Sequence, residues 1–280
     1  MQESAPAPTT GTKRKRNSPR RAPPLPSAVT VSLGTRQTQD DRHIVIRDAW
    51  ESGLTADTSR WPACRFFGVF DGHKGDAASQ LASHTLWSKL RPQLVSLIKE
   101  ASGAMPPMSE IRAAVEEAFA ATDARILEEC GSSGSTATVA LIIGDTICVA
   151  NLGDSRTVLC RSERKFWETE DHKPALPSER ARIEARGGHV ATPRAEGQLN
   201  VPRLNSVLSV SRAFGDAAFK TGDGDTGGRA LTAEPEITLR TVSQFDTFLL
   251  LASDGLWDVM RYRMNILLEP PCIKVKQNLR

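Results

Sequence analysis

Two apolar segments of the chain end in the same way, with an aspartate followed by a glycine. Residues 66–70 run into DGH at 71–73, and residues 248–252 run into SDG at 253–255. A carboxylate at the end of a buried strand is held rigidly, and glycine lets the backbone carbonyl approach a ligand closely. Carboxylate and carbonyl oxygens are the ligands that Mg²⁺ and Mn²⁺ require. One Asp-Gly pair is usually a turn, but two behind predicted strands favour a metal site.

Two further acidic groups strengthen the metal interpretation, namely Asp40-Asp41 and Asp154 within GDSR at 153–156. Carboxylates that converge at strand ends repel one another, and bound cations remove that cost. Asp154 also fits a second role, as the aspartate of a tight turn. The chain has no Walker loop, GxSxG elbow or HExxH motif, so neither P-loop nucleotide hydrolysis nor serine or zinc hydrolysis is supported.

The elements that position these residues alternate between short apolar runs and amphipathic stretches. Apolar spacings of three and four residues predict helices over 77–94 and from Ser109 to Gly131. A third helix is expected to start at Ser178, after Pro177, and to end at Gly187-Gly188. Strands joined by short turns, with long helices beside them, indicate an α+β fold of antiparallel sheets with helices packed outside. The predicted strands cover residues 43–47, 65–70, 137–143, 146–151, 155–160 and 247–252.

Composition places the chain among ordinary soluble globular proteins. Of its 280 residues 39% are hydrophobic and 25% charged, which excludes collagen-like, coiled-coil and wholly disordered classes. The net charge is only +3 and aromatic residues make up 5%, so a nucleic-acid-binding role is not expected. No apolar run approaches the ~20 residues of a membrane span, and we expect no membrane association. The five cysteines have no CxxC spacing and are interpreted as free thiols.

The chain divides into three parts. Residues 1–28 are rich in proline and basic residues and are expected to form a disordered arm. Its run Lys13–Arg16 fits a nuclear import signal, a contact with an anionic surface, or a solvated tail without a partner. We therefore expect a cytoplasmic or nuclear location, or both. Residues 29–259 form the folded domain, and 260–280 form a short divergent tail.

Eight strings, in this order and spacing, resemble the metal-dependent, type 2C (PPM) protein serine/threonine phosphatases. The resemblance covers roughly residues 30 to 259. It implies a four-layer αββα sandwich of two mostly antiparallel sheets flanked by helices, with a two-metal centre at one end. The strings are FGVFDGHKG (67–75), GSTATVALI (134–142), VANLGDSR (149–156), DHKP (171–174), RIEARGGHV (182–190), LSVSRAFGD (208–216), AEPEI (233–237) and LLASDGLWDV (250–259).

The resemblance also implies a set of metal ligands for two Mg²⁺ or Mn²⁺ ions. Asp71 bridges the two ions and the carbonyl of Gly72 ligates one of them. Asp254 ligates the metal pair, and Asp41, with Asp40 beside it, acts on bound waters. A third, weaker ion is held in some members at the positions that match Asp154 and Asp258.

Two further residues match positions that act on the substrate. Arg36 matches the phosphate-binding arginine, and its planar fork suits two phosphoryl oxygens; the alternative is a surface arginine paired with Asp40 or Asp41. His73 matches the general acid that protonates the leaving serine or threonine oxygen; the alternative is a capping or core histidine. Residues 189–207, with Arg203 and Asn205, match a flap beside the site.

The resemblance implies an enzyme that hydrolyses phosphoserine and phosphothreonine in proteins by attack of a metal-activated water, and we expect a monomer. In the family the chain continues past Val259 to an Asp-Asn pair that supplies another metal ligand. Here residues 260–280 hold no aspartate, and Glu269 is their sole acid. The alternative is therefore a weakened or inactive phosphatase-like binding module, with a sandwich that is incomplete at its C-terminal end.

Overall fold

The computed structural model describes residues 25–34, 36–51, 54, 57–193, 201–220 and 229–260. Most of the predicted arm, including Lys13–Arg16, lies outside the described residues. So do part of the predicted flap (194–200), the Gly/Asp-rich segment 221–228 and the tail after Met260. Within the described ranges, no helix is both long and apolar enough to cross a membrane.

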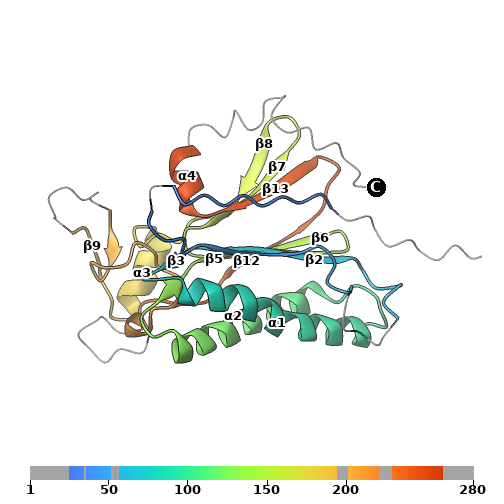
Figure 1. Cartoon of the computed structure of the whole chain (residues 1–280), viewed down its shortest axis with the longest axis horizontal. Helices are drawn as coiled ribbons and strands as arrows, with labels where there is room; N and C mark the ends of the chain where they lie inside the picture. Colours follow the sequence, from blue (N-terminus) through green and yellow to red (C-terminus); the bar gives the residue numbers. More distant parts are fainter. Residues whose placement is uncertain are drawn as a thin grey trace, which may run out of the picture.

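Two antiparallel sheets stack on each other, as Figure 1 shows. The first sheet has the order β1-β2-β5-β6-β12, and the second has the order β13-β7-β8. Short turns join neighbouring strands, and Gly144 closes the β5–β6 turn in the left-handed region, with φ +58°. The first sheet consists of β1 (Arg42–Ile46), β2 (Cys64–Phe70), β5 (Ala137–Ile143), β6 (Thr146–Leu152) and β12 (Glu236–Thr241), and the second of β13 (Asp246–Ala252), β7 (Arg156–Arg161) and β8 (Lys165–Glu168).

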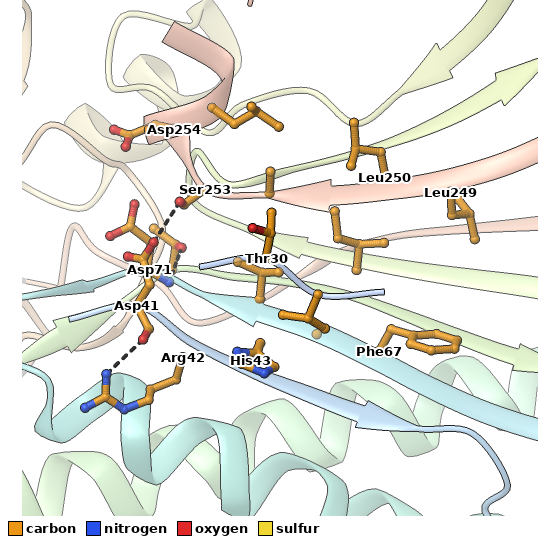
Figure 2. A pocket seen from close by; sticks show the side chains of 18 of the residues that line it. Thr30, Asp41, Arg42, His43, Phe67, Asp71, Leu249, Leu250, Ser253 and Asp254 are labelled. Carbon is orange, nitrogen blue, oxygen red and sulfur yellow. Dashed lines mark hydrogen bonds between the residues drawn. The ribbon is translucent and has the colours of Figure 1, made fainter. Parts of the chain in front are cut away.

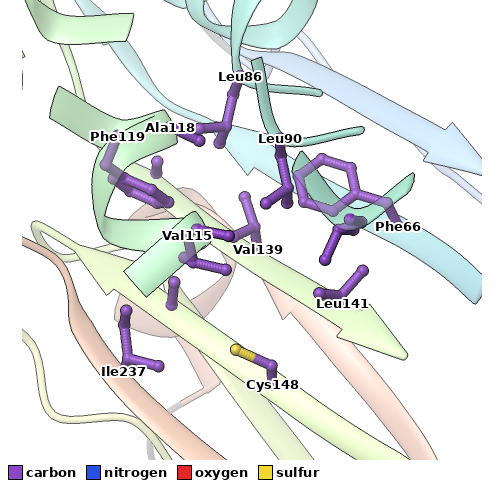
Figure 3. Packing of buried hydrophobic residues seen from close by; sticks show 14 of the residues in the cluster. Phe66, Leu86, Leu90, Val115, Ala118, Phe119, Val139, Leu141, Cys148 and Ile237 are labelled. Atoms are coloured by element: carbon purple, nitrogen blue, oxygen red, sulfur yellow. The ribbon is translucent and has the colours of Figure 1, made fainter. Parts of the chain in front are cut away.

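Helices cover the outer face of the first sheet. Helices α1 (Ala77–Glu100) and α2 (Met108–Glu129) lie side by side beneath it in Figure 1. Their apolar stripes meet the large side chains of the sheet, for example Leu90 against the region of Phe66 (Figure 3). Strands β5 and β6 are buried along their whole length, because helices cover one face and the second sheet covers the other.

The segment between β8 and β12 has a small hydrophobic core of its own. Helix α3 (Pro177–Ala185), the pair β9 (Val190–Ala191) and β10 (Arg203–Leu204), and the 3₁₀ turn Ala217–Phe219 contribute to it. A short three-stranded sheet connects this region to the main sandwich. That sheet has the order β11-β4-β3 and consists of β11 (Phe214–Gly215), β4 (Gly134–Ser135) and β3 (Gly72–His73).

The predicted α+β fold with antiparallel sheets is confirmed. In the two main sheets, β8 and β12 were not predicted, and neither were the two-residue strands β3, β4, β9, β10 and β11. Helix α1 extends to Glu100, beyond the predicted end at residue 94. The second helix begins at Met108, with Pro107 rather than the expected Ser109 at the N-cap position. Over the second sheet, the described residues place one short helix, α4 (Asp254–Met260), which directly follows β13.

Candidate active site

The acidic residues predicted from sequence gather at one end of the sandwich. Asp71 follows the last residue of β2, and Asp254 begins α4 just after β13. Asp41 directly precedes β1, which is the antiparallel neighbour of β2. Asp154 lies in the turn between β6 and β7. Figure 2 shows Asp41, Asp71 and Asp254 at the acidic end of a groove whose wall continues along apolar side chains such as Leu249.

Asp71 is the centre of this group. Burial is the largest cause that raises the pKa of Asp71, and with the charges of Asp41, Asp254 and Asp154 it brings that pKa to about 9. Its backbone is fixed to the start of β5, because its N–H donates to Oγ1 of Thr136 at 3.2 Å and its carbonyl accepts from the Thr136 N–H at 2.9 Å. The chain therefore holds a carboxylate rigidly where its charge is not compensated.

Asp41 connects the first strand to the end of β13. The hydroxyl of Ser253 donates to Oδ2 of Asp41 at 2.9 Å (Figure 2). The guanidinium of Arg42 donates to the backbone carbonyls of Gln39 and Asp41 and forms an ion pair with Asp76. Arg42 therefore fixes the backbone that carries Asp41, while the Asp41 carboxylate stays directed toward Ser253.

Asp254 and Asp154 form the second half of the group. Burial raises the pKa of Asp254, and the charges of Asp154 and Asp258 raise it further. Lys173 forms an ion pair with Asp154, whose side chain is buried, and the charge of Lys173 opposes the rise at Asp254. Asp258 lies one helical turn after Asp254 in α4 and is exposed. Both Asp154 and Asp258 are thus placed beside Asp254.

The donor set fits a hard divalent cation. Burial and mutual repulsion disfavour the ionised carboxylates, and a bound cation would reverse this. Among the described residues, no three His, Cys, Asp or Glu side chains already lie close enough to hold an ion by direct ligation alone. Mg²⁺ usually keeps several waters and takes only one or two protein carboxylates. An oxygen-rich pocket that leaves room for water is therefore suited to it.

Gly72 and Gly255 follow the two aspartates, but only Gly72 is required by the space around it. A Cβ on Gly72 would lie 2.5 Å from the carbonyl oxygen of Asp40 and 2.7 Å from Oγ of Ser79. A Cβ on Gly255 would meet only Oγ of Ser253, at 3.9 Å. The absence of a side chain at Gly72 thus brings the segment of Asp40 and Asp41 against the end of β2.

We expect Gly72→Ala to raise the Mn²⁺ concentration needed for half-maximal metal binding about tenfold or more. The new methyl group displaces the backbone at Asp40, and such overpacking also costs roughly 1–3 kcal/mol of stability. A Mn²⁺ binding titration, together with urea unfolding, measures both effects. Gly255→Ala is the matched control. It is expected to change the half-maximal Mn²⁺ concentration by less than about twofold and to leave the free energy of unfolding nearly unchanged. Equal behaviour of the two variants would contradict this prediction.

His73 and Arg36 occupy different surroundings. Nε2 of His73 lies 2.5 Å from Oδ2 of the buried Asp216, and the His73 side chain remains 28% exposed. Arg36 is exposed and borders the groove. Among the described residues it forms no ion pair with Asp40 or Asp41, which was the alternative considered from sequence.

The described part of the predicted flap also borders the groove, at Arg203. Its guanidinium donates to the carbonyl of Val207 at 2.8 Å, and Oδ1 of Asn205 accepts from the His189 N–H at 2.9 Å. These bonds close the turn after β10. They hold Arg203 at the edge of the groove.

Four residues of this site were not given roles from sequence, although all four lie in the quoted strings. Thr136, Ser253 and Asp216 stand in the strings that also contain β5, Asp254 and β11, and Lys173 is the lysine of DHKP. What shows their roles is their partners in space. Asp216, for example, is 143 residues from His73 in the chain.

Three of the cysteines in the described part of the chain do not fit a thiol nucleophile. Burial raises the pKa of Cys148 to about 12 and that of Cys160 to about 11. Burial likewise raises the pKa of Cys64. These three residues lie in strands of the sandwich and are buried, so they remain protonated and serve packing.

The chain is similar in sequence to known proteins. "Probable protein phosphatase 2C 22" of Arabidopsis thaliana is 35% identical over 246 residues, which are 85% of this chain and 57% of that protein. "Probable protein phosphatase 2C 59" of Oryza sativa subsp. japonica is 36% identical over 217 residues, 75% of this chain and 58% of that protein. The chain thus spans less than two thirds of the length of these relatives.

A solved structure has the same fold. The serine-threonine phosphatase 2C from Toxoplasma gondii superposes with a TM-score of 0.65 at 26% identity, covering 85% of this chain and 82% of that one. The family profile described as "Protein phosphatase 2C" matches residues 29–267. That match includes both sheets, the helices and the acidic residues at the strand ends. The chain therefore belongs to the protein phosphatase 2C family.

Proposed function

We propose that this chain is a metal-dependent phosphatase that removes phosphate from phosphoserine and phosphothreonine in proteins. The observation that carries the proposal is the convergence of Asp41, Asp71, Asp154 and Asp254 at one end of the sandwich, with Lys173 beside them. Such a cluster is costly in the absence of cations. Dependence on divalent metal is general in the family, and phosphorylated proteins are the substrates that family membership implies.

Each acidic residue has a place in the proposed metal site, which we assign to two Mg²⁺ or Mn²⁺ ions. Asp71 and the carbonyl of Gly72 would hold the pair together with Asp254, and Asp41 would orient bound water. Asp154 and Asp258 would hold a third, weaker ion once Lys173 releases Asp154. When bound, such ions lower the pKa of a water and bind phosphoryl oxygens.

The remaining chemistry falls to two side chains of the protein. Arg36, exposed at the groove, would bind two phosphoryl oxygens through its planar guanidinium. His73, adjacent to Gly72, would donate a proton to the oxygen of the departing serine or threonine. Donation to that oxygen matters because an alkoxide is a poor leaving group.

The test is phosphate release from a phosphothreonine peptide by the 280-residue chain, with Mn²⁺, with Mg²⁺ and with a chelator. We expect release with either ion and none with the chelator. A rate that is unchanged by metal removal would refute the proposal. The alternative, a binding module with weakened or no turnover, predicts instead that the peptide binds in the presence of metal and no phosphate is released.

A further inference from the structure

A buried carboxylate with no role in metal binding contacts the proposed proton donor. The Asp216 side chain is fully buried. Its Oδ2 is hydrogen-bonded to Nε2 of His73, and its Oδ1 accepts from Nζ of Lys74 at 2.7 Å. Burial by itself raises the pKa of Asp216, but the hydrogen bonds and charges of His73 and Lys74 outweigh burial and lower it. Asp216 is therefore an ionised acceptor.

The small sheet β11-β4-β3 sets this contact. His73 is opposite Gly134 in β4, and Gly134 is opposite Gly215, the residue before Asp216. A Cβ on Gly134 would lie 2.2 Å from Oδ2 of Asp216 and 2.3 Å from Nε2 of His73. The pair thus fills the space that the missing side chain of Gly134 leaves.

The backbone is strained at Asp216 itself and at Lys74, the residue after His73. Lys74 has φ +58° and Asp216 has φ +53°, both in the left-handed region. Residues other than glycine adopt this region at a cost, and such residues concentrate at functional sites. A backbone hydrogen bond helps to hold this conformation, because the N–H of Asp216 donates to the carbonyl of Ser133 at 3.1 Å.

We propose that Asp216 is a positioning residue for proton transfer by His73. It holds the imidazole through Nε2–H, which leaves Nδ1 as the ring nitrogen that donates to the substrate. No described residue forms a hydrogen bond with Nδ1. A carboxylate behind an imidazole fixes its tautomer and its orientation, as in hydrolase triads. The inference rests on the proposed phosphatase function.

In the step that His73 assists, the water oxygen bonds to phosphorus as the bond from phosphorus to the ester oxygen breaks. The electron pair of that bond stays on the ester oxygen, and the proton on Nδ1 passes to it and gives the free alcohol. His73 becomes neutral, and its Nε2–H still donates to Asp216. The proton lost by the attacking water goes to solvent, from which Nδ1 is protonated again.

The test compares two substrates that differ in their need for a proton. The leaving group of a phosphothreonine peptide is an alkoxide, which needs a proton. The leaving group of p-nitrophenyl phosphate is a stabilised phenolate, which does not need one. We expect Asp216→Asn to lower kcat for the peptide about a hundredfold. We expect it to lower kcat for p-nitrophenyl phosphate by less than about threefold. His73→Gln should give the same pattern, and the double variant should show no further loss.

Asp123→Asn is the matched control for a structural effect. Oδ1 of Asp123 accepts from the Gly215 N–H at 2.8 Å and from Lys220, so this carboxylate supports β11 without touching His73. It should affect both substrates to the same degree. Equal losses on both substrates in Asp216→Asn, or additive losses in the double variant, would overturn the inference.

Two further results keep the test decisive. In the unmodified protein, a hydrogen-bonded imidazole N–H of His73 should give a downfield proton signal that disappears in His73→Gln. Its absence would overturn the inference even where Asp216→Asn fails to fold. Failure of the phosphatase proposal looks different, because the unmodified chain would then release no phosphate from either substrate in the presence of metal.

Discussion

Asp71→Asn is expected to lower metal-dependent phosphate release about a thousandfold while it stabilises the metal-free protein. Loss of a central ligand removes several kcal/mol of transition-state stabilisation, at roughly 1.4 kcal/mol for each factor of ten. Without metal, however, the ionised Asp71 carboxylate destabilises the folded protein. Burial and the neighbouring carboxylates raise its pKa from 3.8 to about 9, so its ionisation in the folded state is unfavourable.

The sign of the pH dependence follows from this shift. Between about pH 4 and pH 9 the folded metal-free protein binds more protons at Asp71 than the unfolded chain does. Its free energy of unfolding therefore falls as pH rises through this range. Asp71→Asn removes this contribution. We expect its melting temperature in chelator to exceed that of the unmodified protein by about 3 °C or more at pH 8, and by less at pH 5.

The measurements are thermal unfolding in chelator at several pH values and phosphate release with Mn²⁺. Asp57→Asn is a suitable control, because Asp57 is exposed and its carboxylate accepts from the Ser59 N–H at 3.0 Å, away from the groove. It should change neither property. Two results would contradict the electrostatic explanation. One is a melting temperature of Asp71→Asn below that of the unmodified protein, and the other is a difference between the two melting temperatures that does not change with pH.

The sequence predicted well those strands and helices whose apolar residues are buried against neighbouring layers, because their burial sets the apolar pattern of the sequence. Strands β5 and β6 are continuous apolar runs because they are covered on both faces. Strand β8 (Lys165–Glu168) is mostly exposed, and β12 is a short edge strand whose apolar residues are Ile237 and Leu239. Neither strand contains the continuous run of three or more apolar residues that revealed the other two edge strands, β1 and β13.

The site could be predicted only in part, for a physical reason of the same kind. Asp71 and Asp254 were expected to meet, because each ends a strand and strand ends converge. The contacts of Asp216 with His73 and of Lys173 with Asp154 join polar side chains in a two-residue strand and in turns. No hydrophobic period or turn signal marks such pairs. They become visible only when the packing of the small sheet and of the β6–β7 turn is known.

A second carboxylate, Glu179 in α3, holds the small core beside the site. Its side chain is 2% exposed. Oε1 accepts from the Arg212 guanidinium at 2.7 Å, and Oε2 accepts from Arg182 at 2.8 Å and from Oγ of Ser211 at 2.7 Å. Arg182 also donates to the carbonyl of Ala230. Glu179 therefore joins α3 to the segments before β11 and β12, and so supports the strand that precedes Asp216.

We expect Glu179→Gln to lower the free energy of unfolding by about 3 kcal/mol at pH 7, measured by urea unfolding. Removing one partner of a buried ion pair leaves the other charge uncompensated, here on two arginines. Glu184→Gln is the control on the same helix. Glu184 is exposed, 3.6 Å from Arg180, and such a surface pair contributes less than about 1 kcal/mol.

The pH dependence separates this electrostatic explanation from a simple packing defect. Burial alone would raise the pKa of Glu179, but hydrogen bonds from Arg212, Arg182 and Ser211 outweigh it and lower the pKa from 4.5 to about 2. The stability that Glu179 contributes is therefore complete above about pH 4.5 and is lost as pH falls toward 2. The difference between the unmodified protein and Glu179→Gln should shrink over that range. A difference that stays constant down to pH 3 would point to packing instead, because packing does not titrate.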